Sequence, residues 1–290
     1  MSRKKSRALG KHNLWRRGTP AGLIAKRRLG QHFLEQTWIK KVIAAVEPKR
    51  EDYFIEIGPG TGALTFALAE RSCRVLAVEV DPDLVAGLRK VGHDSVETLE
   101  ADFLDIELSI LIERLGVTNE KSIRIVGNLP YNISVPILSR TLRAAKKSGV
   151  TDATFMLQHE VAARVVASVG AREYGPLAVM ATLHSDARRL FDLPGGAFRP
   201  APRVRSSLVA LRFREAARTP TDINHFYSVV RTLFSQRRKY VVNGLARAIT
   251  SSQIDAATLC QRAGVVPTRR PGELTLPELI ELAEVLKSSK

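Results

Sequence analysis

Cysteine and long apolar runs are scarce in this sequence, and their scarcity excludes several kinds of protein. Two of the 290 residues are cysteine, Cys73 and Cys260, and they lie too far apart to give a metal-binding spacing. No apolar run approaches the roughly 18 residues that a membrane-spanning helix needs, and the N-terminus lacks the apolar core of a secretory signal. We therefore expect a reduced protein of the cytoplasm, with no metal and no membrane association.

Acidic residues are absent from the first 34 positions, which hold ten lysines and arginines. Residues 35–187 hold 17 basic and 21 acidic residues, whereas residues 188–290 hold 18 basic and eight acidic ones. The net charge of +16 is thus concentrated towards the two ends of the chain. This distribution is typical of a catalytic body whose extensions bind a polyanion such as nucleic acid. The alternative is a solvated surface rich in lysine and arginine.

The pattern of the chain predicts three segments. Residues 1–25 form a basic arm without hydrophobic period, which we expect to stay disordered until RNA is bound, unless it is an organelle transit peptide. Residues 26–215 alternate strand and helix patterns, and residues 216–290 have only helical periodicity after a polar, proline-containing linker at 216–221. We therefore expect an α/β domain followed by a small all-helical C-terminal domain. No internal repeat is visible.

The larger domain has the pattern of a Rossmann-like fold, in which alternating strands and helices give a mostly parallel sheet covered on both faces. Strands are expected at 53–57, 74–79, 96–101, 123–126, 154–157 and 207–213. Helices are expected at 63–70, 83–91 and from 134 onward, and in the C-terminal domain at 225–234, 239–249, 255–263 and 276–287. Ligands of such sheets bind beyond the carboxyl ends of the strands, so we expect the functional residues there.

A glycine-rich turn, Gly58-Pro-Gly60-Thr-Gly62, follows the first of these strands, and Glu56 precedes it within the strand. Glycines such as Gly58 and Gly60 let a ligand approach the backbone closely. A dinucleotide fingerprint would space them as G-x-G-x-x-G to bind a pyrophosphate, whereas the spacing here is G-x-G-x-G. That form suits a nucleoside with an amino-acid tail and no phosphate, such as S-adenosylmethionine. A tight structural turn could also contain three glycines.

Two acidic residues at the ends of the next two strands support a nucleoside cofactor. Glu79 lies 21 residues after Gly58, where a carboxylate can accept hydrogen bonds from both ribose hydroxyls. Asp102 can accept a hydrogen bond from the amino group of the cofactor's adenine, although a single aspartate here could instead cap a helix. Three consecutive strand ends with matching chemistry predict S-adenosylmethionine as the cofactor.

The sharpest motif is Asn128-Leu129-Pro130-Tyr131, at the end of the fourth strand. An adenine amino nitrogen is a poor nucleophile because its lone pair is delocalised into the ring. The Asn128 amide oxygen and the carbonyl of Leu129 or Pro130 can accept its two N–H groups, which turns the lone pair toward a sulfonium methyl. Pro130 fixes the turn, and Tyr131 offers a ring on which an extruded base can stack. The alternative is a loop in which Asn and Pro only make a turn.

Phe198 begins a proline-stiffened loop that ends at Ser206, and its ring could cover the other face of the extruded adenine. A phenylalanine near prolines is, however, often a packing residue. Neither Cys73 nor Cys260 lies at a strand end, so the cysteine nucleophile that pyrimidine C5 methylation needs is not evident. Together the motifs favour methylation of an adenine amino group in RNA.

These motifs resemble those of the ribosomal RNA adenine N6-dimethyltransferase family, of the small-subunit (KsgA) type. The resemblance runs from about Lys26 to Leu286 and rests on Leu29-Gly-Gln-His-Phe-Leu34, Glu56 to Gly62, Glu79, Asp102, Asn128-Leu-Pro-Tyr131, Phe198 to Ser206 and Gln236-Arg-Arg-Lys239. The chain departs from the family pattern at His32, where many members have Asn, and at Arg205, where many have Asp. His32 is a modest polar exchange, whereas Arg205 adds charge near the expected RNA entrance.

The resemblance implies roles for the site residues. His32 and Leu34 would line the methionine end of the cofactor pocket, and Gly58 would form its floor. The two strand-end acids would bind the ribose and the adenine as set out above. Asn128 would serve every methyl transfer, because the family adds two methyl groups to each adenine.

The resemblance also implies the substrate, which is small-subunit rRNA in a late assembly particle. The family modifies two adjacent adenines in a hairpin loop near the 3′ end of that RNA, and we expect the enzyme to be a monomer. One alternative is the large-subunit enzyme of macrolide resistance, but Phe234-Ser-Gln-Arg-Arg-Lys239 and the helical segment ending near Leu286 look more like the small-subunit type. Another is an assembly checkpoint factor with incidental turnover, which the two basic ends suggest.

Overall fold

The computed structural model of the chain describes residues 31–117, 122–248 and 255–289, so the basic arm at 1–25 lies outside the described residues. The chain folds into two compact units. The first comprises the described residues up to Ala162 together with Arg188–Phe213, and the second comprises Ala163–Ala187 together with those from Arg214 onward. Among the described residues, no helix combines the length and apolar character that crossing a membrane requires.

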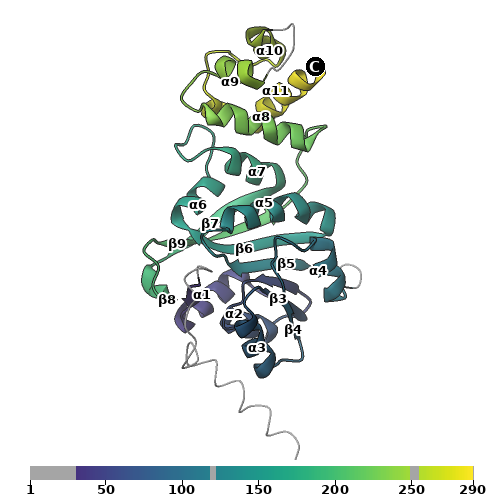
Figure 1. Ribbon diagram of the computed structural model, residues 1–290, viewed down its shortest axis with the longest axis vertical. Coiled ribbons are helices and arrows are strands. Elements are labelled where there is room, and N and C mark those ends of the chain that lie inside the picture. Colours follow the sequence, from purple (N-terminus) through teal and green to yellow (C-terminus); the bar gives the residue numbers. More distant parts are fainter. Residues whose placement is uncertain (1–30, 118–121, 249–254, 290) are drawn as a thin grey trace, which may run out of the picture. The chain divides into compact units, whose positions relative to one another are not determined.

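A seven-stranded sheet organises the first unit, with strand order β4-β3-β2-β5-β6-β9-β7 (Figure 1). The strands β4, β3, β2, β5 and β6 run parallel, and β9 is antiparallel to β6. Their bounds are β2 Tyr53–Ile57, β3 Arg74–Glu79, β4 Val96–Glu100, β5 Ile123–Asn128, β6 Val150–Gln158, β7 Ser185–Leu193 and β9 Ser206–Phe213. The predicted Rossmann-like, mostly parallel sheet is confirmed. Strand β7 has no counterpart among the predicted strands.

A second, two-stranded sheet joins distant parts of the sequence. β1 (Phe33–Leu34) pairs antiparallel with β8 (Phe198–Arg199), so that Leu34 lies opposite Phe198. This pairing fixes the segment that contains His32 next to the proline-containing loop that follows Phe198. Neither strand was predicted, because each has only two residues and no periodicity of its own.

The helices of the first unit begin where local sequence favours a helix start. At α3, the Asp81 side chain accepts a hydrogen bond from the Asp83 N–H, and Pro82 occupies the first helical position, where its missing N–H costs nothing. Pro136 lies in the first turn of α5 for the same reason. The helices are α1 Gln36–Val46, α2 Ala63–Ala69, α3 Pro82–Val91, α4 Leu108–Leu115, α5 Ser134–Ala144 and α6 His159–Val165, with 3₁₀ turns at Ala145–Ser148 and Gly195–Ala197.

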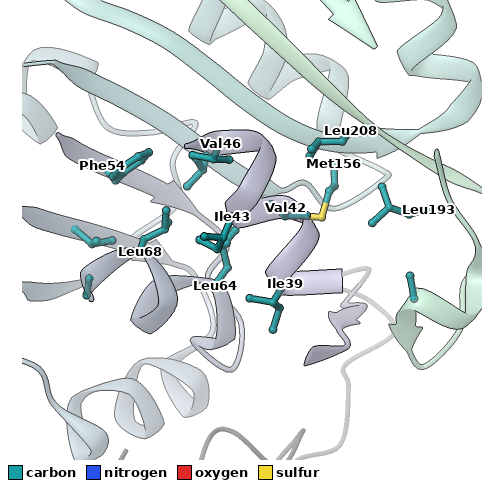
Figure 2. Close-up of a cluster of buried hydrophobic side chains, with 14 of the residues drawn as sticks. Ile39, Val42, Ile43, Val46, Phe54, Leu64, Leu68, Met156, Leu193 and Leu208 are labelled. Carbon is teal, nitrogen blue, oxygen red and sulfur yellow. The ribbon is translucent and has the colours of Figure 1, made fainter. Parts of the chain in front are cut away.

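One face of the sheet packs against α1 and α2. The buried residues of α1 recur at the three- and four-residue spacing of one helix face and lie beside α2 and β2 in Figure 2. The cluster extends across the sheet to Met156 on β6 and Leu208 on β9. Its labelled members are Ile39, Val42, Ile43, Val46, Phe54, Leu64, Leu68, Met156, Leu193 and Leu208. This core packs against the strands whose carboxyl ends contain the predicted functional residues.

Among its described residues, the second unit contains helices joined by loops, and its strand residues are the first ones of β7. Its helices are α7 Pro176–His184, α8 Ile223–Ser235, α9 Val241–Ala248, α10 Ala256–Arg262 and α11 Leu276–Ser288, with a 3₁₀ turn at Pro271–Glu273. Asp222 caps α8 and Asp255 caps α10, each by accepting two backbone N–H bonds. The four helices predicted in this region are thus present. In the run Gln236-Arg-Arg-Lys239, on which the family resemblance partly rests, Arg237 donates to the Ala171 carbonyl at 2.8 Å, while Arg238 and Lys239 are exposed.

Residues 163–187 belong to the second unit, whereas the sequence-based division into 26–215 and 216–290 placed them in the first domain. The reason is packing: α7 contacts α8 and α11. In addition, the Tyr174 hydroxyl donates to the Leu274 carbonyl at 3.1 Å. Helix α7 is apolar on nearly every side, so its sequence does not indicate which unit it joins.

Candidate active site

The carboxyl ends of four adjacent parallel strands, β4, β3, β2 and β5, surround one pocket of about 240 Å³. Seven of the predicted site residues line it: His32, Gly58, Gly60, Glu79, Asp102, Asn128 and Pro130. They come from sequence positions up to 98 residues apart. The parallel sheet brings six of them together because each ends or follows one of its strands, whereas His32 precedes β1 of the two-stranded sheet. Among the described residues, no cluster of His, Cys, Asp and Glu could bind a metal.

The glycine turn closes the pocket at the end of β2. Gly60 has a φ of +58°, and its N–H donates a 3.1 Å hydrogen bond to Oε2 of Glu79. A Cβ at Gly60 would lie only 3.1 Å from the ring of Phe33, so a side chain here would press against the segment that contains His32. The turn therefore contacts both Glu79 on one side of the pocket and the segment of His32 and Phe33 on the other.

Glu79, the last residue of β3, is only 5% exposed. Its Oε1 accepts hydrogen bonds of 3.0 Å from the N–H groups of Val80 and Asp81, and its Oε2 accepts the one from Gly60. Burial raises the pKa of this carboxyl, and the three N–H bonds act in the opposite direction. The carboxylate is thus fixed in one orientation at the pocket wall, with lone pairs left for hydroxyl donors.

Asp102 lies two residues beyond the end of β4 and is partly buried. Its Oδ1 accepts a 2.8 Å hydrogen bond from the N–H of Leu104, which stabilises the turn after the strand. A carboxylate has two oxygens, so this bond leaves Oδ2 as an acceptor for a ligand. The residue can therefore act both as a turn cap and as a pocket acceptor, two roles that the sequence presents as alternatives.

Asn128, the last residue of β5, donates a 2.5 Å hydrogen bond from Nδ2 to the backbone carbonyl of His32. Because a carbonyl can only accept, the amide nitrogen must face His32 and the amide oxygen must point elsewhere. Gly127 makes this position possible: a Cβ there would lie 2.8 Å from the Ile57 carbonyl, so only glycine lets β5 approach the end of β2 so closely.

Tyr131 lies beside the pocket and does not line it. Its ring stacks on the ring of His32, with centroids 5.4 Å apart and planes at 28°, and its hydroxyl forms a 2.6 Å hydrogen bond with Oγ of Ser206. Burial raises the pKa of the Tyr131 hydroxyl. One face of the predicted stacking ring is thus already covered by a residue that itself lines the pocket.

Three predicted residues lie away from the pocket. Phe198 is 1% exposed and packs in the hydrophobic cluster with Leu193 and Leu208, so its ring cannot cover a base in this conformation. The pairing of β8 with β1 directs it inward, together with Leu34, which packs against the same cluster. The side chain of Leu129 is also buried, and the residue does not line the pocket.

Sequence reasoning missed the apolar part of the pocket. Val80 and Phe103 line it, directly after Glu79 and Asp102, and Ile133 and Ile137 line it from the start of α5. Val80 is 47% exposed although it is a large apolar residue. In the sequence, the signal that could have identified this surface is an apolar residue directly after each strand-end acid, because a nucleoside base needs apolar contacts as well as hydrogen bonds.

Glu56 differs from the other acids, because it is only 2% exposed and faces the α2 side of the sheet. Burial raises its pKa from 4.5 to about 8, and its Oε2 has no hydrogen-bond partner among the described residues. Glu56 is therefore protonated near neutral pH. It lies beneath the glycine turn and does not line the pocket.

Comparison with known proteins agrees with this geometry. The profile of the family described as "Ribosomal RNA adenine dimethylase" matches residues 22–275. Proteins named "Ribosomal RNA small subunit methyltransferase A" from Xanthomonas euvesicatoria pv. vesicatoria and Xanthomonas campestris pv. campestris are each 39% identical over 265 residues, which is 90% of this chain and 96% of theirs.

Two solved structures have the same fold. A dimethyladenosine transferase from Plasmodium falciparum has a TM-score of 0.71 and 22% identity, over 87% of this chain and 96% of the other. The 23S rRNA methyltransferase ErmE has a TM-score of 0.64 and 25% identity, over 88% of this chain and 99% of the other. The family expected from the sequence motifs is confirmed: the chain belongs to the ribosomal RNA adenine dimethylase family and is an rRNA adenine methyltransferase.

Proposed function

We propose that the pocket binds S-adenosylmethionine and presents its methyl group to an adenine of small-subunit rRNA. The cofactor, when bound, supplies an electrophilic methyl on a sulfonium. The hydrogen-bond acceptors in the pocket fit such a nucleoside: Glu79 has lone pairs for the two ribose hydroxyls, and Asp102 has an oxygen for the adenine amino group. His32 and Gly58 lie beside Asn128, where the methionine end would lie: the His32 carbonyl accepts the Asn128 amide N–H, and a Cβ at Gly58 would lie 4.0 Å from the Asn128 carbonyl oxygen.

The observation on which the proposal depends is the orientation of Asn128. Its Nδ2 is used by the His32 carbonyl, so its Oδ1 is the group available to accept an N–H from the target adenine. The carbonyl of Pro130 already accepts the N–H of Ile133 at 3.1 Å, which favours the Leu129 carbonyl as the second acceptor. Two acceptors pull the amino nitrogen out of conjugation with the ring, and its proton is lost readily after methylation.

The small subunit is the proposed target because of the relatives. Those named as small-subunit enzymes are 39% identical to this chain, whereas the large-subunit enzyme ErmE is 25% identical. The proposal includes two methyl groups on each of two adjacent adenines in a hairpin loop near the 3′ end, added to a late assembly particle in the cytoplasm by a monomeric enzyme. The base must leave its stack to reach Asn128, which costs least in a loop.

The test is transfer of tritiated methyl groups from S-adenosylmethionine to undermethylated small subunits, with the product nucleoside identified by mass spectrometry. We expect dimethyladenosine at two neighbouring positions. The Asn128→Ala variant should lose transfer and still bind the cofactor, while Asn243→Ala, an exposed asparagine on α9, should match the wild type. Monomethyladenosine alone, or label in large-subunit RNA, would contradict the proposal.

A further inference from the structure

The loop of residues 200–205 is fixed to the pocket at both ends. At one end, His32 lines the pocket and its Nδ1 donates a 2.7 Å hydrogen bond to the carbonyl of Pro200. At the other end, Oγ of Ser206 bonds to the hydroxyl of Tyr131, whose ring stacks on His32. The N–H of His159 also donates to the Arg205 carbonyl at 2.9 Å. The loop is therefore a fixed rim beside the place where Asn128 meets its substrate.

The rim contains two arginines without a counter-charge. Arg203 and Arg205 are exposed, and neither forms an ion pair or side-chain hydrogen bond within the described residues. Their neighbour Arg199, by contrast, is paired with Glu35. Asp192, on β7, accepts a hydrogen bond from Ser207 and lies 3.7 Å from Arg189 and 3.5 Å from His159.

A hydrogen-bond chain stiffens the base of this rim. Ser207 donates to Asp192 at 2.7 Å, and Nδ1 of His159 lies 3.1 Å from Oγ of Ser207. Because Ser207 is fully buried and its hydroxyl is directed at the carboxylate, this cluster is not a nucleophile with its base. It joins the ends of β6, β7 and β9, and so limits how far Arg203 and Arg205 can move.

We propose that Arg203 and Arg205 bind the phosphates of the RNA strand on either side of the nucleotide that enters the pocket. Guanidinium groups bind phosphate oxygens through paired N–H donors, and a fixed rim loses little entropy when it does so. An RNA strand whose base has been extruded must expose its flanking phosphates at this rim. The inference rests on the proposed function for the identity of that base. Beyond that function, it identifies the surface that positions the RNA strand.

The experiment measures binding of the full chain to undermethylated small subunits, and separately to their deproteinised rRNA, over a range of KCl concentrations. The Arg203→Ala/Arg205→Ala variant should weaken both interactions about tenfold and lower the salt slope by about 1.5–2, because each lost phosphate contact removes about 0.7–1. The KM for RNA should rise while kcat at saturating RNA and the Kd for S-adenosylmethionine stay unchanged. Arg205→Lys should retain most of the affinity.

The control is Arg212→Ala, which removes one positive charge from an exposed residue near the opposite end of β9. It should leave the salt slope unchanged. Weaker binding to particles with unchanged binding to deproteinised rRNA would show that the rim contacts a ribosomal protein, and would overturn the inference. An unchanged salt slope would also overturn it. If the slope falls but small-subunit adenines are not methylated by the wild type, the proposed function fails and the phosphate contact stands.

Discussion

The amide nitrogen of Asn128 and the backbone carbonyl of His32 are joined by a 2.5 Å hydrogen bond across 96 residues of sequence. This bond positions the Asn128 side chain before any substrate arrives, so the residue is oriented by the protein and not by the base. It also explains why His32, which precedes β1 and is not part of the main sheet, lines the pocket.

The Asn128→Asp variant tests this orientation. A carboxylate cannot donate to the His32 carbonyl, so two oxygens would face each other and the side chain would turn away. We expect methyl transfer to fall about 100-fold, in the range found when one preorganised hydrogen-bonding group is lost from an active site. The measurement is single-turnover transfer to undermethylated small subunits, alongside calorimetric binding of the cofactor. Near-wild-type transfer by this variant would mean that the bond to His32 does not orient the catalytic oxygen.

Replacing Glu79 by glutamine should weaken cofactor binding. The amide would point an NH₂ group at one of the backbone N–H donors of Gly60, Val80 or Asp81, and one ribose hydroxyl would lose its acceptor. We expect the Kd for S-adenosylmethionine to rise about 10–100-fold, which corresponds to the roughly 1.5–3 kcal/mol of a hydrogen bond to a charged group. Isothermal titration calorimetry measures it.

Glu100→Gln is the control for Glu79→Gln, because Glu100 lies opposite Glu79 on the neighbouring strand and is exposed. Its cofactor affinity should equal that of the wild type. If both variants lose the same affinity for S-adenosylmethionine, the loss comes from removing a negative charge and not from the ribose contact.

Glu56 should make the stability of the protein depend on pH. The unfolded chain ionises this carboxyl above about pH 4.5, whereas the folded protein keeps it protonated up to about pH 8. The free energy of unfolding should therefore fall as the pH rises between these values and level off above them, by at most about 5 kcal/mol. Glu56→Gln cannot ionise, so its stability relative to the wild type should increase over the same interval.

Urea denaturation of the ligand-free protein at a series of pH values measures this difference, with the exposed Glu51→Gln as the control for loss of one carboxylate. Parallel pH profiles for the wild type and Glu56→Gln would show that the buried carboxyl does not titrate as the structure indicates.

Arg124 should be a stability residue and not a functional one. Its guanidinium bonds to Asp52 and Asp152 at 2.8 Å and donates to the Val46 carbonyl at 2.7 Å, at the end of the sheet opposite the pocket. Arg124→Met would leave two partly or fully buried carboxylates without a counter-charge, at a cost of about 3–5 kcal/mol. The cofactor Kd of the folded fraction should not change.

Arg114→Met provides the contrast, since Arg114 is exposed in its ion pair with Glu97 and should contribute at most about 1 kcal/mol. Adding Asp52→Asn and Asp152→Asn to Arg124→Met should restore part of the lost stability, because no charge then remains buried. If the triple variant is less stable than Arg124→Met, uncompensated charge is not the cause of the loss.

The grouping of the strand-end residues around one pocket could be predicted from the sequence because it depends on local patterns. Gly58, Glu79, Asp102 and Asn128 each follow or end an apolar run, and parallel strands bring such ends together whatever the rest of the fold does. The pairing of Leu34 with Phe198 could not be predicted, because it joins two-residue strands 164 positions apart. Pairings of that kind are decided by tertiary packing and leave no periodic trace in either segment.

Strand β7 shows the same limit. Its nine residues include a run of exposed side chains, Arg188 to Leu190, so no alternation of apolar and polar residues indicates a strand. It forms because β9 offers hydrogen-bonding partners on its free edge. Residues 163–187 fall in the second compact unit, and not in the predicted segment 26–215, for a related reason: the apolar helix α7 would suit the core of either unit.

Phe198 gives the last prediction, which separates a core residue from a base-stacking residue. Its ring is buried among Leu193, Leu208 and neighbouring apolar side chains, so Phe198→Ala should lower the free energy of unfolding by about 3–5 kcal/mol. Phe198→Leu keeps most of the buried volume and should cost less than about 1.5 kcal/mol. Methyl transfer by Phe198→Leu should therefore stay close to that of the wild type.

Tyr131→Leu, which removes the ring that stacks on His32, should lower kcat/KM at least about tenfold, as the loss of one stacking contact of about 1–3 kcal/mol implies. If Phe198→Leu keeps its stability but loses as much activity as Tyr131→Leu, the Phe198 ring must leave the core to cover the base when RNA binds.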